Sequence, residues 1–303
     1  MSVPCVTQTD LAGLKLRGRG KVRDIYDVGE HLLIVASDRI SAFDWVLPSP
    51  IPFKGRVLTQ ISVFWFEKLA KLTKHHLVTA DVDEMPAEVR KHKDILRGRA
   101  MLCRKAVPFG AECIVRGYLT GSGWKDYQKT NSVCGIKLEP GMQKNARLLP
   151  PLFTPSTKAE VGLHDENIDF EGFREIVGAA HADELKRRSL AAFESASEHG
   201  RSVGVTICDT KLEWGLIGPD LVLIDEVFTP DSSRFWKSAE FAATPPGGDP
   251  PSFDKQVVRN WLETSGWNKS SPPPQLPKDI VETATARYLE IYERLTGRKL
   301  DVN

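Results

Sequence analysis

The stretch DTKLEWG at residues 209–215, followed by LIDE at 223–226, decides the fold of this chain. Successive side chains of a strand point to opposite faces, so Asp209, Lys211 and Glu213 share one face and the residues between them share the other. The first face is charged and the second is mostly apolar, which is typical of a strand with one side on a core. The pattern therefore predicts a β-hairpin that carries acids around one lysine.

The length of the hairpin loop determines which carboxylates meet, because a shift of one residue exchanges the faces of a strand. A two-residue loop at 218–219 pairs Glu213 with Ile224, whereas a three-residue loop at 218–220 pairs Glu213 with Asp225. Opposed carboxylates, with Cβ atoms roughly 5 Å apart, repel unless a proton or a divalent cation lies between them. The second register would suit Mg²⁺, which takes one or two carboxylates together with water and substrate phosphates. A solvated strand with alternating charges is the competing interpretation.

The composition is that of an ordinary globular protein. The chain has 303 residues, enough for two domains, and its 41 basic and 40 acidic residues give a net charge of +1. This balance produces no long-range attraction to nucleic acid or to an anionic membrane, so neither partner is expected. The five cysteines lack C-x-x-C spacing, which argues against a disulfide framework or a zinc site. Because there is no signal-peptide pattern and no apolar run of about 20 residues, a cytoplasmic location is predicted.

Hydrophobic periodicity predicts the main elements. A hairpin is expected over 21–36 and a packed helix over 57–72, with a long polar loop between them. A short strand follows at 112–117. Helix-forming composition extends over 169–200, and a final amphipathic helix is expected at about 279–297. Helix-rich sequence thus separates two regions of sheet.

Several segments carry the residues of an anion site, in which glycines let backbone amides approach a phosphate and arginines or hydroxyls bind it. None matches a complete nucleotide-binding glycine signature, and a structural turn is the alternative for each. His164 and Asp165, which follow Lys158 in a loop, suggest a further part of a site. The two anion segments are GRGKVRDIY at 18–26 and VRGYLTGSG at 115–123, where a loop is expected from Thr120 to Gly123. A third segment, TPDSSRFW at 229–236, follows the acidic hairpin and places Arg234 beside two aromatic residues.

Five stretches, taken in order, resemble the successive motifs of one enzyme family: GKVRDIY, SDRISAFD, ECIVRGYLTGSGW, DTKLEWG and LIDEVFTPDSSRFW. The family is the SAICAR synthetases, and the likeness extends over about residues 15–300, in the longer form typical of fungal members. Members join L-aspartate to carboxyaminoimidazole ribonucleotide and convert ATP to ADP and phosphate. The resemblance therefore implies an amide-forming ligase of de novo purine biosynthesis that uses ATP and Mg²⁺, with an acyl phosphate as the expected intermediate.

The resemblance also implies roles for individual residues. Lys211, Glu213 and Asp225 are expected to be catalytic, and the two carboxylates to bind both ATP and Mg²⁺, which favours the three-residue loop. Near Lys105 the chain departs from the family pattern, with Pro108 two positions earlier than usual. The other predicted ATP contacts are Lys21, Arg23, Lys105 and Lys158, and the predicted substrate contacts are Ser41, Asp44, Arg116, Ser122 and Arg234.

An α+β fold follows from the same resemblance. An N-terminal antiparallel sheet similar to the small lobe of a kinase is expected over 1–112, and a larger ATP-grasp-like domain with C-terminal helices over 113–303. A monomer is expected, as is typical of fungal members. A kinase is the first alternative, but the chain lacks H-R-D-x-x-x-x-N and D-F-G. A non-catalytic relative would have lost the lysine or the acids of DTKLEWG, and a nucleic-acid-binding module is disfavoured by the charge balance.

Overall fold

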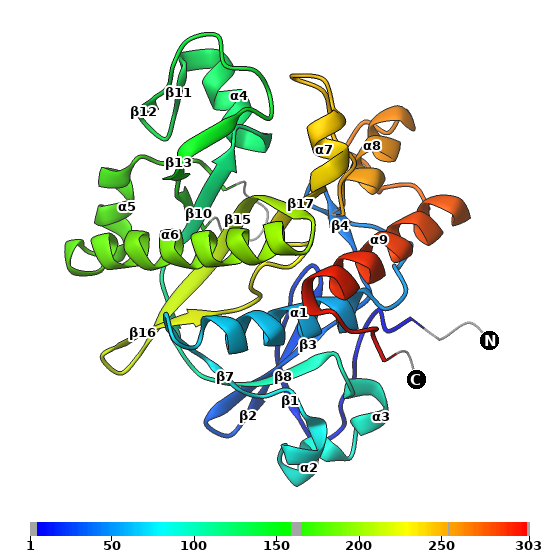
Figure 1. Ribbon diagram of the computed structural model, residues 1–303. Helices are drawn as coiled ribbons and strands as arrows, with labels where there is room; N and C mark the ends of the chain where they lie inside the picture. Colours follow the sequence, from blue (N-terminus) through cyan, green and yellow to red (C-terminus); the bar gives the residue numbers. More distant parts are fainter. Residues whose placement is uncertain (1–4, 159–164, 254, 302–303) are drawn as a thin grey trace.

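The computed structural model describes residues 5–158, 165–253 and 255–301. It contains two main sheets with helices around and between them, which confirms the predicted α+β class (Figure 1). The N-terminal sheet is antiparallel, as expected, and the predicted hairpin at 21–36 forms two of its strands. In spatial order the strands are β1 (Lys15–Arg19), β2 (Arg23–Val28), β3 (His31–Ala36), β8 (Ala100–Arg104) and β7 (Leu77–Thr79).

The second sheet is mixed, because all of its strand pairs are antiparallel except β16 with β6. Two of its strands, β6 and β9, precede residue 113, so the N-terminal segment contributes to both sheets. The division of the chain at 112/113 stays a prediction. In spatial order the main strands are β13 (Arg147–Phe153), β10 (Ala111–Tyr118), β15 (Val205–Ile217), β16 (Asp220–Ile224) and β6 (Lys74–His75). The strands β9 (Val107–Pro108) and β17 (Ser233–Lys237) pair with β15, and β14 (Ser156–Thr157) pairs with β10.

The β15–β16 hairpin has a two-residue loop, so the three-residue loop that the resemblance favoured is wrong. Glu213 lies opposite Ile224, and the ladder continues to the residues that flank the Gly218–Pro219 turn. Gly218 has a φ of 58°, and glycine at the first central position is preferred in one type of two-residue hairpin turn. Asp225 consequently follows the last paired residue, and its own φ of 65° turns the chain out of the strand.

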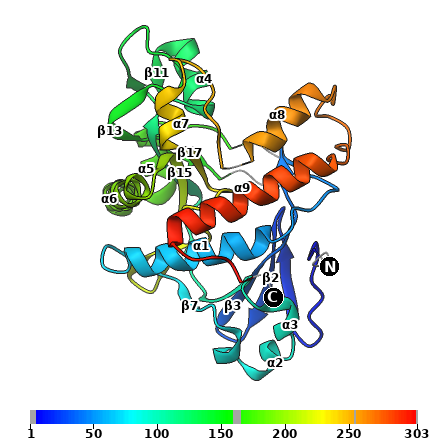
Figure 2. The same cartoon turned by 45° about the vertical axis from the view of Figure 1, so that its right-hand side comes forward.

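Helices cover both sheets. Between the two sheets, α1 and α9 lie side by side (Figures 1 and 2). Two local expectations change. Residues 121–123 begin a helix rather than a loop, and the helical region at 169–200 is two helices because Gly178, with a φ of 84°, separates them. No helix in the described part of the chain is long and apolar enough to cross a membrane. The longer helices are α1 (Lys54–Leu69), α4 (Gly121–Thr130), α5 (Phe170–Val177), α6 (Ala179–Ser202), α8 (Gln256–Thr264) and α9 (Lys278–Thr296).

Shorter elements complete the fold. One face of the N-terminal sheet packs on α1, and the other packs on a separate cluster that includes residues of three short helices. Two small hairpins lie outside the main sheets. The short helices are η1 (Val82–Glu84), α2 (Ala87–Arg90), α3 (Lys93–Leu96) and α7 (Ser238–Ala243); the hairpins are β4 (Ser41–Ala42) with β5 (Trp45–Val46), and β11 (Ser132–Val133) with β12 (Ile136–Lys137).

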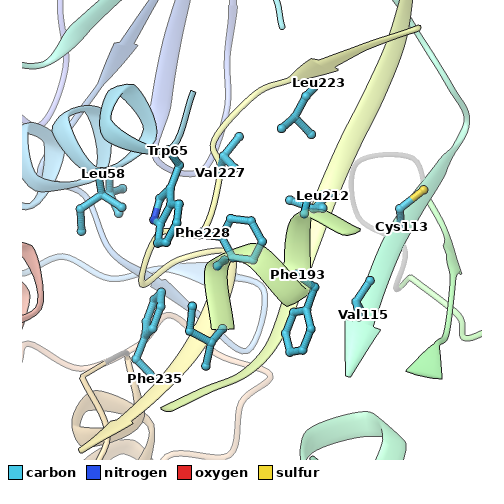
Figure 3. Packing of buried hydrophobic residues seen from close by; sticks show 14 of the residues in the cluster. Leu58, Trp65, Cys113, Val115, Phe193, Leu212, Leu223, Val227, Phe228 and Phe235 are labelled. Atoms are coloured by element: carbon cyan, nitrogen blue, oxygen red, sulfur yellow. The ribbon is translucent and has the colours of Figure 1, made fainter. Parts of the chain in front are cut away.

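The largest hydrophobic cluster joins α1 to the second sheet (Figure 3). Trp65 of α1 is fully buried, and its ring centroid lies 5.2 Å from that of Phe228. Leu212 of β15, Leu223 of β16 and Phe193 of α6 belong to the same cluster. Burying one such side chain contributes about 1.5–3 kcal/mol. This packing fixes the apolar face of β15 and so determines where its charged face must point.

Gly55→Ala should destabilise the fold, because α1 begins in close contact with the end of β3. A Cβ atom at residue 55 would lie 2.3 Å from the carbonyl oxygen of Ala36 and 2.6 Å from Nη1 of Arg99. We expect the free energy of unfolding, measured by urea denaturation, to fall by about 1–3 kcal/mol, as is usual for overpacking. Gly18→Ala is the matched control, since a Cβ atom there meets nothing within 4 Å. Equal stabilities of the two variants would contradict the prediction.

Candidate active site

The charged face of β15 borders two neighbouring cavities. The large cavity, of about 560 Å³, is lined by residues of the N-terminal sheet and of the β15–β16 hairpin, and the small cavity, of about 180 Å³, by residues of β10, β15 and β17. Leu212 and Trp214 point into the core and are 0% and 1% exposed, as the strand pattern predicts. Lys211 and Asp231 line both cavities. Ligands in the two cavities would therefore meet at the same lysine.

The large cavity combines charged and apolar walls. Its charged lining includes cations from the segment before and within β2, a lysine after β14, and the predicted metal carboxylates. Cations beside an apolar surface suit a nucleotide, which has anionic phosphates and a planar base. The charged residues include Lys21, Arg23, Lys158, Glu213 and Asp225, and the apolar residues include Ile25, Leu32, Ile34, Pro108 and Ile224.

A chain of ion pairs runs along β15 in the large cavity. Lys211 Nζ lies 2.6 Å from Glu112 Oε1 and 3.3 Å from Glu213 Oε1, and Lys158 Nζ lies 2.5 Å from Glu213 Oε2. Burial opposes the charge of Glu213, but the two ammonium groups outweigh it and lower its pKa to about 2. Burial also opposes the charge of Lys211, yet Glu213 and Glu112 raise the pKa of this lysine above its usual value. Both Glu213 and Lys211 are therefore ionised at neutral pH.

Asp225 lines the same cavity, but not from the expected position opposite Glu213 in the hairpin. Because it has left the ladder, it does not face Glu213 across the hairpin, and its carboxylate pairs with Arg23 of β2. The Arg23 guanidinium also lies 3.6 Å from Glu226. Among the described residues no three histidine, cysteine, aspartate or glutamate side chains form a metal cluster. Two carboxylates in a cavity with cations that could hold phosphates nevertheless fit Mg²⁺, which completes its shell with water and substrate phosphates.

The small cavity brings together the three residues predicted to hold the ribonucleotide phosphate. Arg116 donates from Nη2 to Ser122 Oγ at 2.8 Å and from Nη1 to Asp209 Oδ2 at 3.2 Å. Arg234 pairs with the same Asp209 carboxylate. It crosses the start of α4 at Gly121, where a Cβ atom would lie 2.5 Å from the guanidinium. Two guanidinium groups share one carboxylate, so they retain a net positive charge that suits a phosphate.

The remaining predicted contacts are placed differently. Ser41 lines the large cavity, whereas Asp44 does not and instead pairs with Lys21 at 2.5 Å. Lys105 lines neither cavity, and its Nζ lies 3.0 Å from Asp27 Oδ1. The structure therefore does not bring Lys105 to the other predicted ATP contacts, and its assignment stays a prediction.

A buried ion cluster beside both cavities was missed in the sequence. Asp231 Oδ2 lies 2.7 Å from Lys54 Nζ and 3.1 Å from Lys255 Nζ, while Oδ1 accepts a hydrogen bond of 2.9 Å from the Tyr288 hydroxyl. Burial opposes the charge of Asp231, but the two ammonium groups lower its pKa below the ordinary value. Lys54 is separated from Asp231 by 177 residues and Tyr288 by 57, so no local pattern could have paired them.

Arg259 of α8 was also missed, and it lines the small cavity. Its i,i+4 spacing from Lys255 places both cations on one face of a helix, a signal that could have found it. His164, another residue considered in the sequence, lies outside the described residues.

Asp231→Asn should destabilise the protein strongly, because it leaves two buried ammonium groups without their carboxylate. We expect a loss of about 3–5 kcal/mol in the free energy of unfolding at pH 7. The lowered pKa means that the carboxylate stabilises the fold above about pH 3.8, its ordinary pKa, and loses this effect at lower pH. The difference between wild type and variant should therefore shrink as the pH falls below that value.

Denaturant titrations at pH 7 and at a pH below about 3.8 measure the difference in the free energy of unfolding between wild type and variant. Asp220→Asn is the control, because Asp220 forms an exposed ion pair with Lys74, and such pairs contribute at most about 1 kcal/mol. A loss for Asp231→Asn no larger than that of the control would show that the cluster has no stabilising role.

Known proteins resemble this chain over nearly its whole length. A family model described as SAICAR synthetase matches residues 16–274. The phosphoribosylaminoimidazole-succinocarboxamide synthase of Syntrophotalea carbinolica is 54% identical over 297 residues, which cover 98% of this chain and 99% of the relative. The protein of the same name from Thermodesulfovibrio yellowstonii is 52% identical, with 96% of this chain and 99% of the relative covered.

Solved structures give the same result. The SAICAR synthase from Saccharomyces cerevisiae complexed with SAICAR has a TM-score of 0.88 at 39% identity, covering 98% of this chain and 99% of that one. A SAICAR synthetase in complex with ADP has a TM-score of 0.69 at 22% identity, covering 93% and 98%, which is a likeness of fold. The yeast protein has the higher score, as the resemblance to the longer fungal form predicts. Since the family model matches most of the chain and close relatives match nearly all of it, the chain belongs to the SAICAR synthetase family.

Proposed function

We propose that this chain joins L-aspartate to the carboxylate of carboxyaminoimidazole ribonucleotide to give SAICAR, while ATP is converted to ADP and phosphate. Membership of the family makes it a carbon–nitrogen ligase of purine biosynthesis. The observation that carries the finer proposal is the meeting of two cavities at Lys211, one suited to a nucleotide and the other to a phosphate. The yeast relative bound to SAICAR supports the choice of product.

In this proposal ATP occupies the large cavity, with its base on the apolar wall and its phosphates toward Lys21, Arg23 and Lys158. Glu213 and Asp225 would hold Mg²⁺, whose positive charge would offset that of the transferred phosphoryl group. The ribonucleotide phosphate would occupy the small cavity between Arg116 and Arg234, with Ser122 as a further donor. This arrangement directs the rest of the ribonucleotide toward Lys211.

The chemistry explains why the two ligands must meet. A carboxylate is a poor electrophile, because its charge repels an amine and its oxygen is a poor leaving group. Transfer of the γ-phosphoryl group to a carboxylate oxygen removes both obstacles, with ADP as the first leaving group. The neutral aspartate amine then attacks the acyl carbon, phosphate leaves, and the nitrogen loses a proton. Lys211, which is ionised, would stabilise the negative charge that develops between the two cavities.

The protein is further proposed to act as a monomer in the cytoplasm. Light scattering coupled to size-exclusion chromatography tests the first part, since the monomer mass is 33.8 kDa. A dimer mass at micromolar concentration would reject it.

Purified protein should release ADP only when ATP, Mg²⁺, carboxyaminoimidazole ribonucleotide and L-aspartate are all present. Both ADP and the amide product are measured, by a coupled assay and by mass spectrometry, with each substrate omitted in turn. ADP release that needs neither carboxylate nor amine would indicate a kinase or hydrolase, and no release under any condition would reject the ligase proposal.

Glu213→Gln should lower Mg²⁺-dependent turnover by at least about tenfold, because it removes one of the two proposed ligand charges. Turnover is measured against the Mg²⁺ concentration, and circular dichroism checks that the fold is retained. Glu184→Gln, at a half-buried position of α6 that lines neither cavity, is the control and should behave as wild type. A wild-type dependence on Mg²⁺ in Glu213→Gln would remove this residue from the metal site.

Lys158→Ala and Lys105→Ala separate the two lysines predicted to contact ATP. Lys158 lines the large cavity and Lys105 does not. We therefore expect the dissociation constant of ATP, measured by calorimetry, to rise by about tenfold or more for Lys158→Ala, as the loss of a charge-assisted contact implies. Lys105→Ala should change it less than about threefold, and the reverse order of effects would restore the prediction made for Lys105 from the sequence.

A further inference from the structure

A third cavity, of about 430 Å³, lies away from the proposed active site, and we name it the rear cavity. Residues of β10, β13, β15, α6 and the start of α7 line it, and α6 runs across the strands on this side of the sheet (Figure 1). Arg116 of β10 lines the small cavity, whereas the next residue, Gly117, lines the rear cavity. Because neighbouring residues of a strand point to opposite faces, the sheet separates the two cavities.

The rear cavity carries two arginines that serve no internal ion pair. Arg147 comes from β13 and Arg201 from the last turn of α6. Within the described part of the chain, neither guanidinium has a hydrogen-bond or ion-pair partner. Arg147 lies opposite Tyr118 in the β10–β13 ladder, and Tyr118 lines the same cavity. Burial raises the pKa of Tyr118, and the charges of Arg147 and Arg201 both oppose this rise. Glu194 is the single acid in the lining, which leaves a net positive charge.

Much of the remaining surface of the rear cavity is apolar. Phe193 and Ile207 are buried at 2% and 3% exposure, while Leu149 is 70% exposed and is the most accessible apolar side chain of the lining. Ser197 adds a polar atom, since its buried Oγ has no hydrogen-bond partner among the described residues. Ser197 and Arg201 are one helical turn apart and so share a face of α6. An unpaired hydroxyl near an unpaired guanidinium can be satisfied by a ligand with several acceptor oxygens.

We propose that the rear cavity binds a small organic anion with an aromatic or apolar body. Its carboxylate or phosphate group would lie between Arg147 and Arg201, and its body against Phe193 and Ile207. Arginine binds both kinds of oxyanion with paired hydrogen bonds, so the two head groups share one chemistry. A volume of about 430 Å³ falls within the range of small-molecule sites. The site is independent of the proposed ligase reaction, because none of these residues lines the large or the small cavity.

The test uses 8-anilinonaphthalene-1-sulfonate, a fluorescent aromatic anion, titrated into the full-length protein. We expect one binding site whose dissociation constant rises by about tenfold in Arg147→Gln and in Arg201→Gln, as the loss of a charge-assisted hydrogen bond implies. Leu149→Glu, at an exposed position, adds a repelling charge and should weaken binding similarly. Arg174→Gln is the matched control, because Arg174 lies on α5 and pairs with Glu171.

Phenyl phosphate and benzoate then identify the head group, since they share a ring and differ in the anion. Displacement of the fluorescent probe by one of them, but not by the uncharged benzyl alcohol, supports the proposal and assigns the phosphate or the carboxylate. Equal probe affinity in wild type, Arg147→Gln, Arg201→Gln and Leu149→Glu would overturn it. Displacement by neither anion would also overturn it. Circular dichroism spectra and thermal transitions that match those of wild type show that each variant is folded. If an arginine variant does not fold, Leu149→Glu still tests the proposal.

Discussion

The buried carboxylate of Asp231 is the constraint on which the arrangement of the two cavities depends. Its partners are Lys54 at the start of α1, Lys255 at the start of α8, and Tyr288 of α9. A buried charge costs several kcal/mol unless its partners stay in place, so these three helices are fixed relative to the second sheet. Because Asp231 lines both cavities, the contacts that hold the helices also form the wall between the proposed binding sites.

Strand β15 connects this framework to the chemistry. Its apolar side chains lie in the core against α1 and α6. Because this face is buried, the opposite, charged face points toward the cavities. The charges on that face are already paired with one another, as in the contacts of Glu213 with Lys158 and Lys211. The oxygens of an incoming phosphate would therefore replace carboxylate oxygens as the partners of these lysines. Such exchange keeps each lysine satisfied before and after binding.

Much of this organisation could be predicted because the signals are local. Alternation along DTKLEWG places Leu212 and Trp214 in the core, and helical periodicity locates α1 and α9 to within a few residues. The ordered motifs identified the family, and they named Arg116, Ser122 and Arg234, which the small cavity brings together. Errors arose where one residue changes the backbone path. Gly178 divides a helix, and the Gly218–Pro219 turn shifts the hairpin register.

By itself the sequence determined the fold class, the family and most residues of the proposed active site, because strand alternation, helical spacing and motif order are properties of neighbouring residues. Only the tertiary structure decided how the carboxylates meet. Asp225 follows the end of β16 and pairs with Arg23, and Asp231 contacts residues of α9 and of the starts of α1 and α8. The rear cavity likewise depends on Arg147 and Arg201, which are far apart in the chain. Such contacts follow from the packing of whole elements, and a pattern within a few residues carries no information about them.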